Sequence, residues 1–201
     1  LNELHYDADG KVCGVTATFD EMNGLGPEKL GATCSVVIGD PSYFGEDRKR
    51  KNGTIIRSMC LLKHPVNRTE EAQSAQIIMP SKHLKGKNTD IFISILSDSH
   101  QVTPKNSGVH LAIVSTAVET SNPVAELNEG IAQLGEIALR FDDIVDTYEP
   151  TAVGTADNVF VTRSYDATSH FEYESREVMD LYERIMGQRL DLSMSLEELQ
   201  K

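Results

Sequence analysis

The sequence predicts a mixed fold of α-helices and β-strands, with an α+β unit in the middle of the chain. Two observations predict it. Short runs rich in β-branched residues follow one another through residues 55–116, separated by turns, and such runs favour a mixed or antiparallel sheet. Near the C-terminal end, residues 158–186 change from a short strand pattern through a polar turn to a helical pattern.

The N-terminal segment is predicted to hold a hairpin, a loop and a buried strand. The pair Asp9-Gly10 supplies the positive φ angles of a tight turn, and a strand is expected from Val12 to Ala17. Glycine-rich residues from Glu21 to Gly31 predict a loop, because their spacing does not fit a dinucleotide-binding fingerprint. The apolar run from Cys34 to Ile38 predicts a strand buried on both faces, as in a partly parallel sheet.

The middle of the chain begins with a basic cluster, Arg48 to Lys51, which is interpreted as a solvated loop. Strands are then predicted at Ile55–Leu62, Gln76–Met79, Ile91–Leu96 and Leu111–Thr116. A helix is expected next, because Asn122 suits the N-cap, Pro123 suits the first helical position and Gly135 can end the helix.

A further strand is predicted from Ile137 to Tyr148, with an acidic end at Asp142, Asp143 and Asp146. No loop of calcium-binding spacing frames these carboxylates, so a solvent-facing strand end is favoured over a metal site.

The strand, turn and helix near the end of the chain form its organising unit. The strand contains Val159 to Val161, the turn runs from Ser164 to His170, and Gly187 is predicted to end the helix. The apolar stripe of the helix is predicted to be Val178, Leu181, Tyr182 and Ile185. The start of such a helix presents unpaired N–H groups and a positive dipole end to any ligand. Ser195 to Glu198 resembles a capping box that opens a short tail helix.

Composition narrows the classes of function. With 39% hydrophobic residues, 201 residues suffice for one large domain or two small ones. The net charge of −12 argues against nucleic-acid binding and stable binding to anionic membranes. Cys13, Cys34 and Cys60 lack zinc-binding spacing and are interpreted as reduced, small core residues of a cytosolic protein. His64 at a strand end is interpreted as structural.

Residue types suited to acid–base chemistry gather in the turn, namely Asp166 and His170 with Ser164 or Ser169. Neighbours on one turn rarely have the geometry of a triad, and such side chains commonly cap helices. The sequence therefore predicts no catalytic, cofactor-binding or metal-binding residue.

Short blocks in a fixed order give the chain a family resemblance. The blocks are GDPSYF (39–44), SAQIIMP (74–80), VSTAVETSNP (114–123), DTYEP (146–150) and SYDATSHFE (164–172). They resemble the C-terminal part of the Rab GDP-dissociation inhibitors, from about Tyr6 to about Met186. The chain opens at Leu1 without a methionine and is interpreted as a fragment.

The resemblance implies an architecture. Residues 1–52 and 151–201 would be parts of a discontinuous Rossmann-like domain, and residues 53–150 an α+β sheet domain. The family shares its fold with flavoproteins and has lost the cofactor, so the resemblance implies no cofactor and makes Asp166 and His170 candidates for a vestigial site.

The resemblance also implies a function without bond chemistry. Family members bind GDP-bound, prenylated Rab GTPases, slow GDP release and recycle Rab proteins between membrane and cytosol. The implied location is cytoplasmic with transient membrane association. The family's Rab-binding platform and lipid pocket lie upstream of the matched region, so the Rab-contacting residues of this chain stay unknown.

Two alternatives stay open. A Rab escort protein shares the fold, and a flavin-dependent oxidoreductase shares the strand, turn and helix. Against the oxidoreductase, Ser164 and Tyr165 stand where close approach of a flavin would favour glycine.

Overall fold

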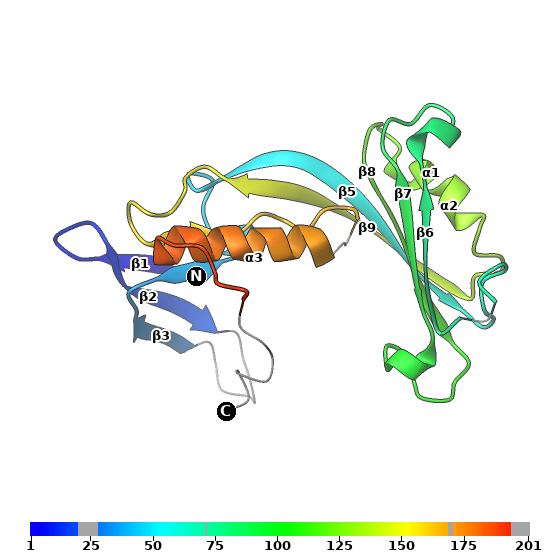
Figure 1. Cartoon of the computed structure of the whole chain (residues 1–201), viewed down its shortest axis with the longest axis horizontal. Coiled ribbons are helices and arrows are strands. Elements are labelled where there is room, and N and C mark those ends of the chain that lie inside the picture. Colours follow the sequence, from blue (N-terminus) through cyan, green and yellow to red (C-terminus); the bar gives the residue numbers. More distant parts are fainter. Residues whose placement is uncertain (20–27, 71, 169–170, 194–201) are drawn as a thin grey trace. The chain divides into compact units, whose positions relative to one another are not determined.

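The structure is a computed structural model that describes residues 1–19, 28–70, 72–168 and 171–193 (Figure 1). It divides into two compact units. Unit 1 comprises residues 1–51, 148–164 and 170–201, and unit 2 comprises residues 52–147 and 165–169. Each unit is built on its own sheets, and the chain combines helices with mostly antiparallel strands.

Unit 1 contains an antiparallel sheet of β1 (Glu3–Tyr6), β2 (Val12–Phe19) and β3 (Glu28–Thr33). The predicted hairpin is confirmed: the Gly10 N–H donates to the Asp7 carbonyl, and Gly10 has φ +74°. The predicted loop is wrong from residue 28 onward, because β3 pairs with β2 in full register. Its glycine is tolerated since every residue of β3 is exposed at a sheet edge. The rest of the predicted loop lies outside the described residues.

A second, parallel sheet pairs β4 (Val37–Gly39) with β10 (Val159–Val161). All of β10 is buried. The parallel pairing agrees with the sequence, but burial of the first strand on both faces is wrong, because Ile38 is 56% exposed. Gly39 is required here: a Cβ would lie 2.8 Å from the Phe44 ring, which follows the short 3-10 helix η1 (Pro41–Tyr43).

The predicted solvated loop at residues 48–51 is wrong, because β5 (Lys49–Leu62) begins inside this basic cluster. Its cations find acidic partners. Arg48 pairs with Asp157 at 2.8 Å, and Arg50 pairs with Glu149 at 2.6 Å. Ion pairing with neighbouring segments lets extended backbone continue where like charges alone favour a loop.

The helix α3 (Phe171–Met186) completes the described part of unit 1. Gly187 ends it as predicted, at φ +69°, donating its N–H to the Glu183 carbonyl. Leu181 is the buried residue of the helix, at 8% exposed. The predicted stripe is wrong at Val178, which is 61% exposed. The predicted tail helix lies outside the described residues.

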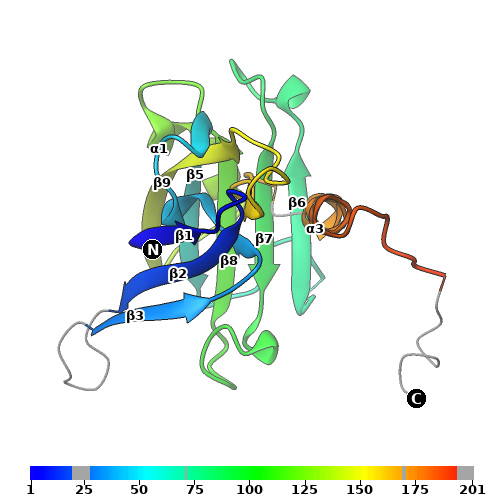
Figure 2. The ribbon, with the colours of Figure 1, turned by 90° about the vertical axis from the view of Figure 1, so that its left-hand side faces the viewer.

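Unit 2 is built on a five-stranded sheet in the order β6-β7-β8-β5-β9. Its other strands are β6 (Ser74–Met79), β7 (Ile91–Leu96), β8 (His110–Ala117) and β9 (Leu139–Pro150). Strands β6, β7 and β8 lie side by side in that order (Figure 2). Turns of 3-10 helix, η2 (Ser81–His83) and η3 (Asp98–His100), follow β6 and β7. The pairs β6–β7, β7–β8 and β5–β8 are antiparallel, as the sequence predicts.

One helix was predicted from Asn122 to Gly135, whereas the structure has two single-turn helices, α1 (Pro123–Glu126) and α2 (Asn128–Ile131). They lie against one face of the sheet (Figure 1). The break falls at Leu127, which is fully buried in the core, whereas Gly130 lies inside α2, where the lack of a side chain lets this helix pack close to the strands. A Cβ on Gly130 would lie 2.7 Å from Ile91 Cγ2 and 2.8 Å from Val114 Cγ1.

The core of unit 2 lies between these helices and the sheet. Its fully buried residues include Ile56, Cys60, Leu62, Ile93, Val114, Leu127 and Leu134. Burial raises the pKa of the Cys60 thiol, so it is a core residue as predicted. Cys13 is not a core residue, because it is exposed on β2.

Candidate functional site

The outer face of the five-stranded sheet, opposite α1 and α2, carries apolar side chains on β5 and β8. Side chains alternate between the two faces of a strand, and Ser58 and Cys60 point into the core. Their neighbours Met59 and Leu61 therefore point outward, and the register sets them beside Ile113 and Leu111 of β8. Met59 is 39% exposed. This face offers apolar side chains and no cluster of catalytic groups.

The turn after β10 crosses this outer face. The Arg57 guanidinium donates to the Asp166 carbonyl at 2.6 Å, and the Ser115 hydroxyl donates to the Ala167 carbonyl at 2.5 Å. Arg57 and Ser115 are register partners on β5 and β8, so two neighbouring strands hold two consecutive carbonyls. Ala167 is consequently 6% exposed. The pKa of Arg57 is lowered by burial, against the opposing influence of Asp166 and Asp143.

The sequence-predicted site residues are placed separately. The Asp166 carboxylate accepts hydrogen bonds from the Thr168 N–H at 2.9 Å and the Thr168 hydroxyl at 2.6 Å, which is the turn role that the sequence predicts. His170 and Ser169 lie outside the described residues. Ser164 forms two hydrogen bonds with Tyr148, each 2.9 Å long. The Ser164 N–H donates to the Tyr148 carbonyl, and the Tyr148 N–H donates to the Ser164 hydroxyl oxygen.

The acidic end of β9 forms hydrogen bonds within its sheet. Asp142 accepts from the Ser58 hydroxyl at 2.5 Å and from Arg140 Nε at 2.8 Å, and Asp146 accepts from Thr54 at 2.8 Å. Burial opposes ionisation of Asp142, but the bonds from Ser58 and Arg140 outweigh it and lower the pKa. In the described part of the chain no three His, Cys, Asp or Glu side chains are placed to hold a metal ion.

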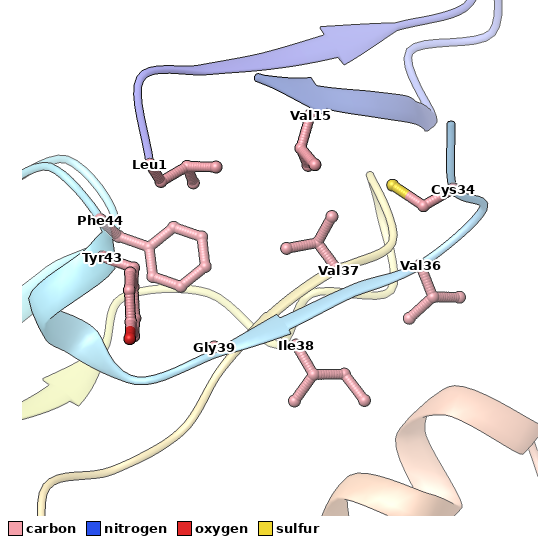
Figure 3. A pocket seen from close by; sticks show the side chains of 9 residues that line it. All are labelled: Leu1, Val15, Cys34, Val36, Val37, Ile38, Gly39, Tyr43 and Phe44. Carbon is pink, nitrogen blue, oxygen red and sulfur yellow. The ribbon is translucent and has the colours of Figure 1, made fainter. Parts of the chain in front are cut away.

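An apolar pocket of about 360 Å³ lies over β4 in unit 1 (Figure 3). It is lined by Leu1, Val15, Cys34, Val36, Val37, Ile38, Gly39, Tyr43 and Phe44. In Figure 3 the Val15 side chain points toward Val37 across the pocket, and the Phe44 ring borders it from the side of η1. The lining carries no charged side chain, and its polar side-chain groups are the Cys34 thiol and the Tyr43 hydroxyl, so the pocket suits a largely apolar group.

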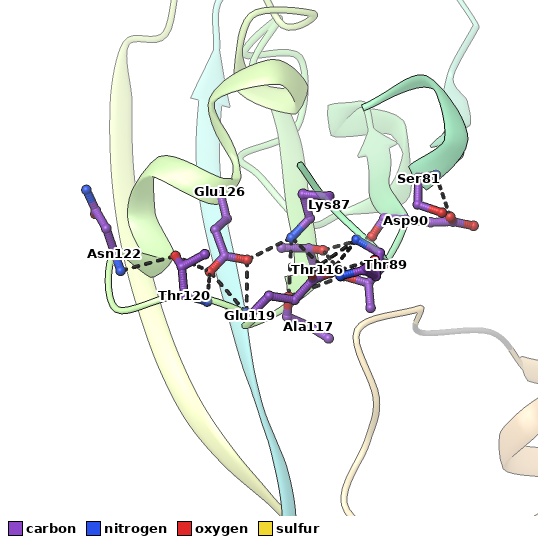
Figure 4. A network of polar contacts seen from close by, with 11 residues as sticks. Ser81, Lys87, Thr89, Asp90, Thr116, Ala117, Glu119, Thr120, Asn122 and Glu126 are labelled. Carbon is purple, nitrogen blue, oxygen red and sulfur yellow. Dashed lines mark hydrogen bonds and ion pairs between the residues drawn. The ribbon is translucent and has the colours of Figure 1, made fainter. Parts of the chain in front are cut away.

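A polar network connects the segment before β7 with the segment after β8 (Figure 4). Glu119 accepts hydrogen bonds from Asn88 N–H and Nδ2 at 3.0 Å and from the Thr89 N–H and hydroxyl at 2.7 and 2.5 Å. Lys87 lies 2.7 Å from Glu126 and 3.7 Å from Glu119. These hydrogen bonds lower the pKa of Glu119 to about 2, and the bond from the Thr89 hydroxyl contributes most.

This network was missed at the level of sequence. Glu119 belongs to the block VSTAVETSNP, but its donors come from residues about 30 positions earlier, a separation that no local spacing reveals. The side chains of Lys87 and Glu126 are only 9% and 5% exposed. The network is therefore a structural clamp rather than an open binding site.

His64 also has a structural role, as predicted. Its Nδ1 lies 2.8 Å from the Pro65 carbonyl and its Nε2 lies 2.9 Å from the Glu136 carbonyl. Both partners only accept hydrogen bonds, so both ring nitrogens donate when His64 is protonated. The hydrogen bond to the Pro65 carbonyl has the larger effect and the one to the Glu136 carbonyl the smaller, and together they raise the pKa of His64.

The sequence model of the GDP dissociation inhibitor family matches residues 1–197 of the chain. The chain belongs to this family. It is 41% identical to guanosine nucleotide diphosphate dissociation inhibitor 1 of Arabidopsis thaliana over 194 residues, which are 96% of this chain and 40% of that protein. It is also 41% identical to a Rab GDP-dissociation inhibitor of Pyricularia oryzae, covering 100% of this chain and 42% of that protein.

A solved structure agrees with these relatives. The crystal structure of a Rab GDP-dissociation inhibitor from Plasmodium falciparum superposes with a TM-score of 0.80 at 38% identity, covering 94% of this chain and 41% of that one. The chain thus spans about two fifths of the length of the relatives that it matches. The resemblance on which the sequence analysis rests is confirmed.

The short sequence blocks that carry the family resemblance correspond to defined elements of the structure. GDPSYF is the end of β4 with η1, SAQIIMP is β6 with the proline that follows it, and the described residues of SYDATSHFE belong to the turn held by the outer face and to the start of α3. In the described residues, no helix combines the length and the apolar character needed to cross a membrane.

Proposed function

We propose that this chain is part of a regulator of Rab GTPases that binds the GDP-bound, prenylated form, slows GDP release and recycles Rab between membrane and cytosol. The match to the GDP dissociation inhibitor family over residues 1–197 carries this proposal. Extracting a lipid anchor requires an apolar site, because each CH₂ contributes about 0.8 kcal/mol to membrane binding. The protein works by binding, so it needs neither an enzymatic reaction nor a cofactor.

The proposed location is cytoplasmic, with transient contact with membranes. The net charge of −12 supports this, since an anionic lipid surface repels an acidic protein that is not drawn there by its cargo. We propose that Rab GTPases are the partners of the whole protein and that nucleic acid is not a partner.

The proposed domain division is a discontinuous Rossmann-like domain, residues 1–52 and 151–201, around an α+β domain, residues 53–150. The parallel pair β4–β10, followed by a turn and α3, supports the Rossmann-like part. On this proposal, Asp166 and His170 belong to a vestigial cofactor site.

A chimera tests the function directly. The segment of the Arabidopsis thaliana relative that matches this chain is replaced by residues 1–201, and release of labelled GDP from a prenylated Rab is measured. We expect the chimera to slow GDP release as the intact relative does. A folded chimera that leaves GDP release at its unassisted rate would refute the proposal.

Two further measurements separate the alternatives. A flavin band in the visible absorbance of the purified chimera would favour the oxidoreductase alternative. Support of Rab prenylation by the chimera, without slowed GDP release, would favour the escort protein.

The isolated chain provides a complementary test. We expect residues 1–201 alone not to retain a GDP-loaded, prenylated Rab in a pull-down, because the family's platform and lipid pocket lie upstream. Stoichiometric retention would instead place a principal Rab-binding surface within this chain.

A further inference from the structure

Two of the three cysteines of the chain face each other across neighbouring strands of unit 1. The register of β2 with β3 reaches Gly14↔Thr33, and the next pair in this register is Cys13 with Cys34. The Cys34 N–H donates to the Cys13 carbonyl at 3.2 Å, so the antiparallel pairing extends to these two residues. Both are free thiols in the structure.

The spacing of such a pair suits a disulfide. In a hydrogen-bonded antiparallel pair the two Cα atoms lie about 5.5 Å apart. Cα atoms that a disulfide joins lie roughly 4.4–6.8 Å apart, so the backbone of Cys13 and Cys34 already has the separation that the bond requires.

The apolar pocket over β4 shows that both side chains lie on the same face. Cys34 and Val15 both line this pocket, and the Cys34 side chain points into it in Figure 3. Side chains alternate between the two faces of a strand. Cys13 lies two residues before Val15 on β2, so its side chain lies on the face that carries Val15 and Cys34.

Cys13 is also the extra residue of a β-bulge on the other side of β2. Strand β1 pairs His5 with Gly14 and Tyr6 with Val12, so its register passes over Cys13. A bulge increases the local twist and redirects side chains. Strand β2 can therefore adjust at Cys13, which is exposed, while its pairing with β3 is kept.

We propose that Cys13 and Cys34 form a reversible disulfide when the chain meets a low-molecular-weight disulfide such as oxidised glutathione. The exposed Cys13 reacts first: its thiolate attacks one sulfur of the oxidant, forms a mixed disulfide and releases one glutathione. The Cys34 thiolate then attacks the Cys13 sulfur and releases the second glutathione. Two electrons pass to the oxidant, and the two thiol protons end on the two released glutathione molecules.

The division of roles follows from exposure. A redox-sensitive cysteine is accessible to solvent and stands beside a second cysteine that resolves the first product. Cys13 is exposed and Cys34 is half-buried next to it, whereas Cys60 is 0% exposed in the core of unit 2. Cys60 therefore takes no part in the exchange.

The crosslink acts on the apolar pocket. It joins β2 to the segment that leads into β4, and both contribute side chains to the pocket lining. Oxidation thus fixes two walls of the pocket to each other, and a reducing cytosol releases them, as is usual for a transient cytosolic disulfide. The inference concerns these two thiols and is independent of the proposed GTPase partner.

Mass spectrometry of the chain after incubation with oxidised glutathione tests the exchange. We expect the parent chain to become about 2 Da lighter, the mass of two hydrogen atoms, with Cys13 bonded to Cys34 and Cys60 still a thiol. Cys34→Ser removes the second step, so the mixed disulfide on Cys13 should rise about tenfold or more above its level in the parent chain. Excess reduced glutathione should restore both thiols of the parent.

Other products would overturn the proposal. If the mixed disulfide on Cys13 persists equally in the parent chain and in Cys34→Ser, Cys34 does not reach the Cys13 sulfur. A parent chain that keeps all three thiols, or that forms disulfides between chains instead of within one, would also refute the pairing. Circular dichroism before oxidation verifies that Cys34→Ser has the fold of the parent, so the comparison reports on the thiols.

Discussion

The Glu119 clamp provides the sharpest quantitative prediction of the structure. Glu119→Gln removes the charge and replaces one acceptor oxygen by an NH₂ group, which faces N–H donors of Asn88 and Thr89. A buried donor left without an acceptor costs about 1–3 kcal/mol, and these exposed donors lie at the low end because water can replace the lost acceptor. The substitution should therefore destabilise unit 2 without changing its packing volume.

The pKa gives a second estimate of the same cost. The clamp lowers the pKa of Glu119 from 4.5 to about 2, and each unit corresponds to about 1.4 kcal/mol. The side chain is 17% exposed, so solvent screens part of this interaction. Because the hydrogen bonds to Glu119 are exposed to solvent, we expect only about 1 kcal/mol of this to appear as a loss in the free energy of unfolding at neutral pH.

The pH dependence separates this explanation from a general loss of packing. A carboxyl group with a lowered folded-state pKa contributes stability above the unfolded pKa of about 4.5, and this contribution disappears as the pH falls toward 2. The difference between parent and Glu119→Gln should therefore shrink to less than half between about pH 7 and pH 3.

Urea unfolding followed by circular dichroism at both pH values measures this difference. Glu129→Gln on α2 is the matched control, because Glu129 is exposed, and it should leave the midpoint unchanged. A Glu119→Gln effect that is equally large at both pH values would refute the electrostatic reasoning.

Three other substitutions follow from burial and hydrogen bonding. Leu181→Ala should cost about 2–5 kcal/mol as a core truncation, whereas Val178→Ala on the same helix should change the urea midpoint little; equal effects would contradict the burial of α3. Gly130→Ala should cost about 1–3 kcal/mol in the same assay, because its Cβ overlaps two core side chains, and a neutral result would mean that α2 can shift outward. His64→Gln should destabilise the protein below about pH 6.5, and this effect should fade as pH rises through the raised pKa of His64, which thermal unfolding across pH 6 to 9 measures. A pH-independent His64→Gln effect would argue against a protonated, doubly donating ring.

Much of the fold follows from local pattern. The strands β6, β7, β8 and β9 were predicted to within a few residues, because β-branched runs between turns leave few alternatives, whereas β5 begins six residues before its predicted start. The hairpin at Gly10 and the helix end at Gly187 were also predictable, since each requires a positive φ angle that glycine supplies. Five ordered blocks were enough to identify the family.

The predictions failed where distant partners decide the structure. The basic cluster predicts a loop from local sequence, yet Arg48, just before β5, pairs with Asp157, and Arg50, within β5, pairs with Glu149, both about 100 residues away in sequence. The helix predicted after Asn122 is interrupted at Leu127, which is buried in the core of unit 2, and Gly130 lets α2 pack against Ile91 and Val114. Local propensity carries no information on either contact.

The candidate sites divide in the same way. From sequence alone, Asp166 could be assigned a turn role, because its partner Thr168 is two residues away. Only the tertiary structure places the carbonyls of this turn on Arg57 and Ser115, assembles the clamp around Glu119 and puts β6 at the end of the strand order of its sheet. The sequence by itself determined the family and where most strands lie along the chain, since these depend on short-range pattern. Which faces and edges stay exposed was decided by strand order in the sheet, because burial depends on neighbours far apart in the chain.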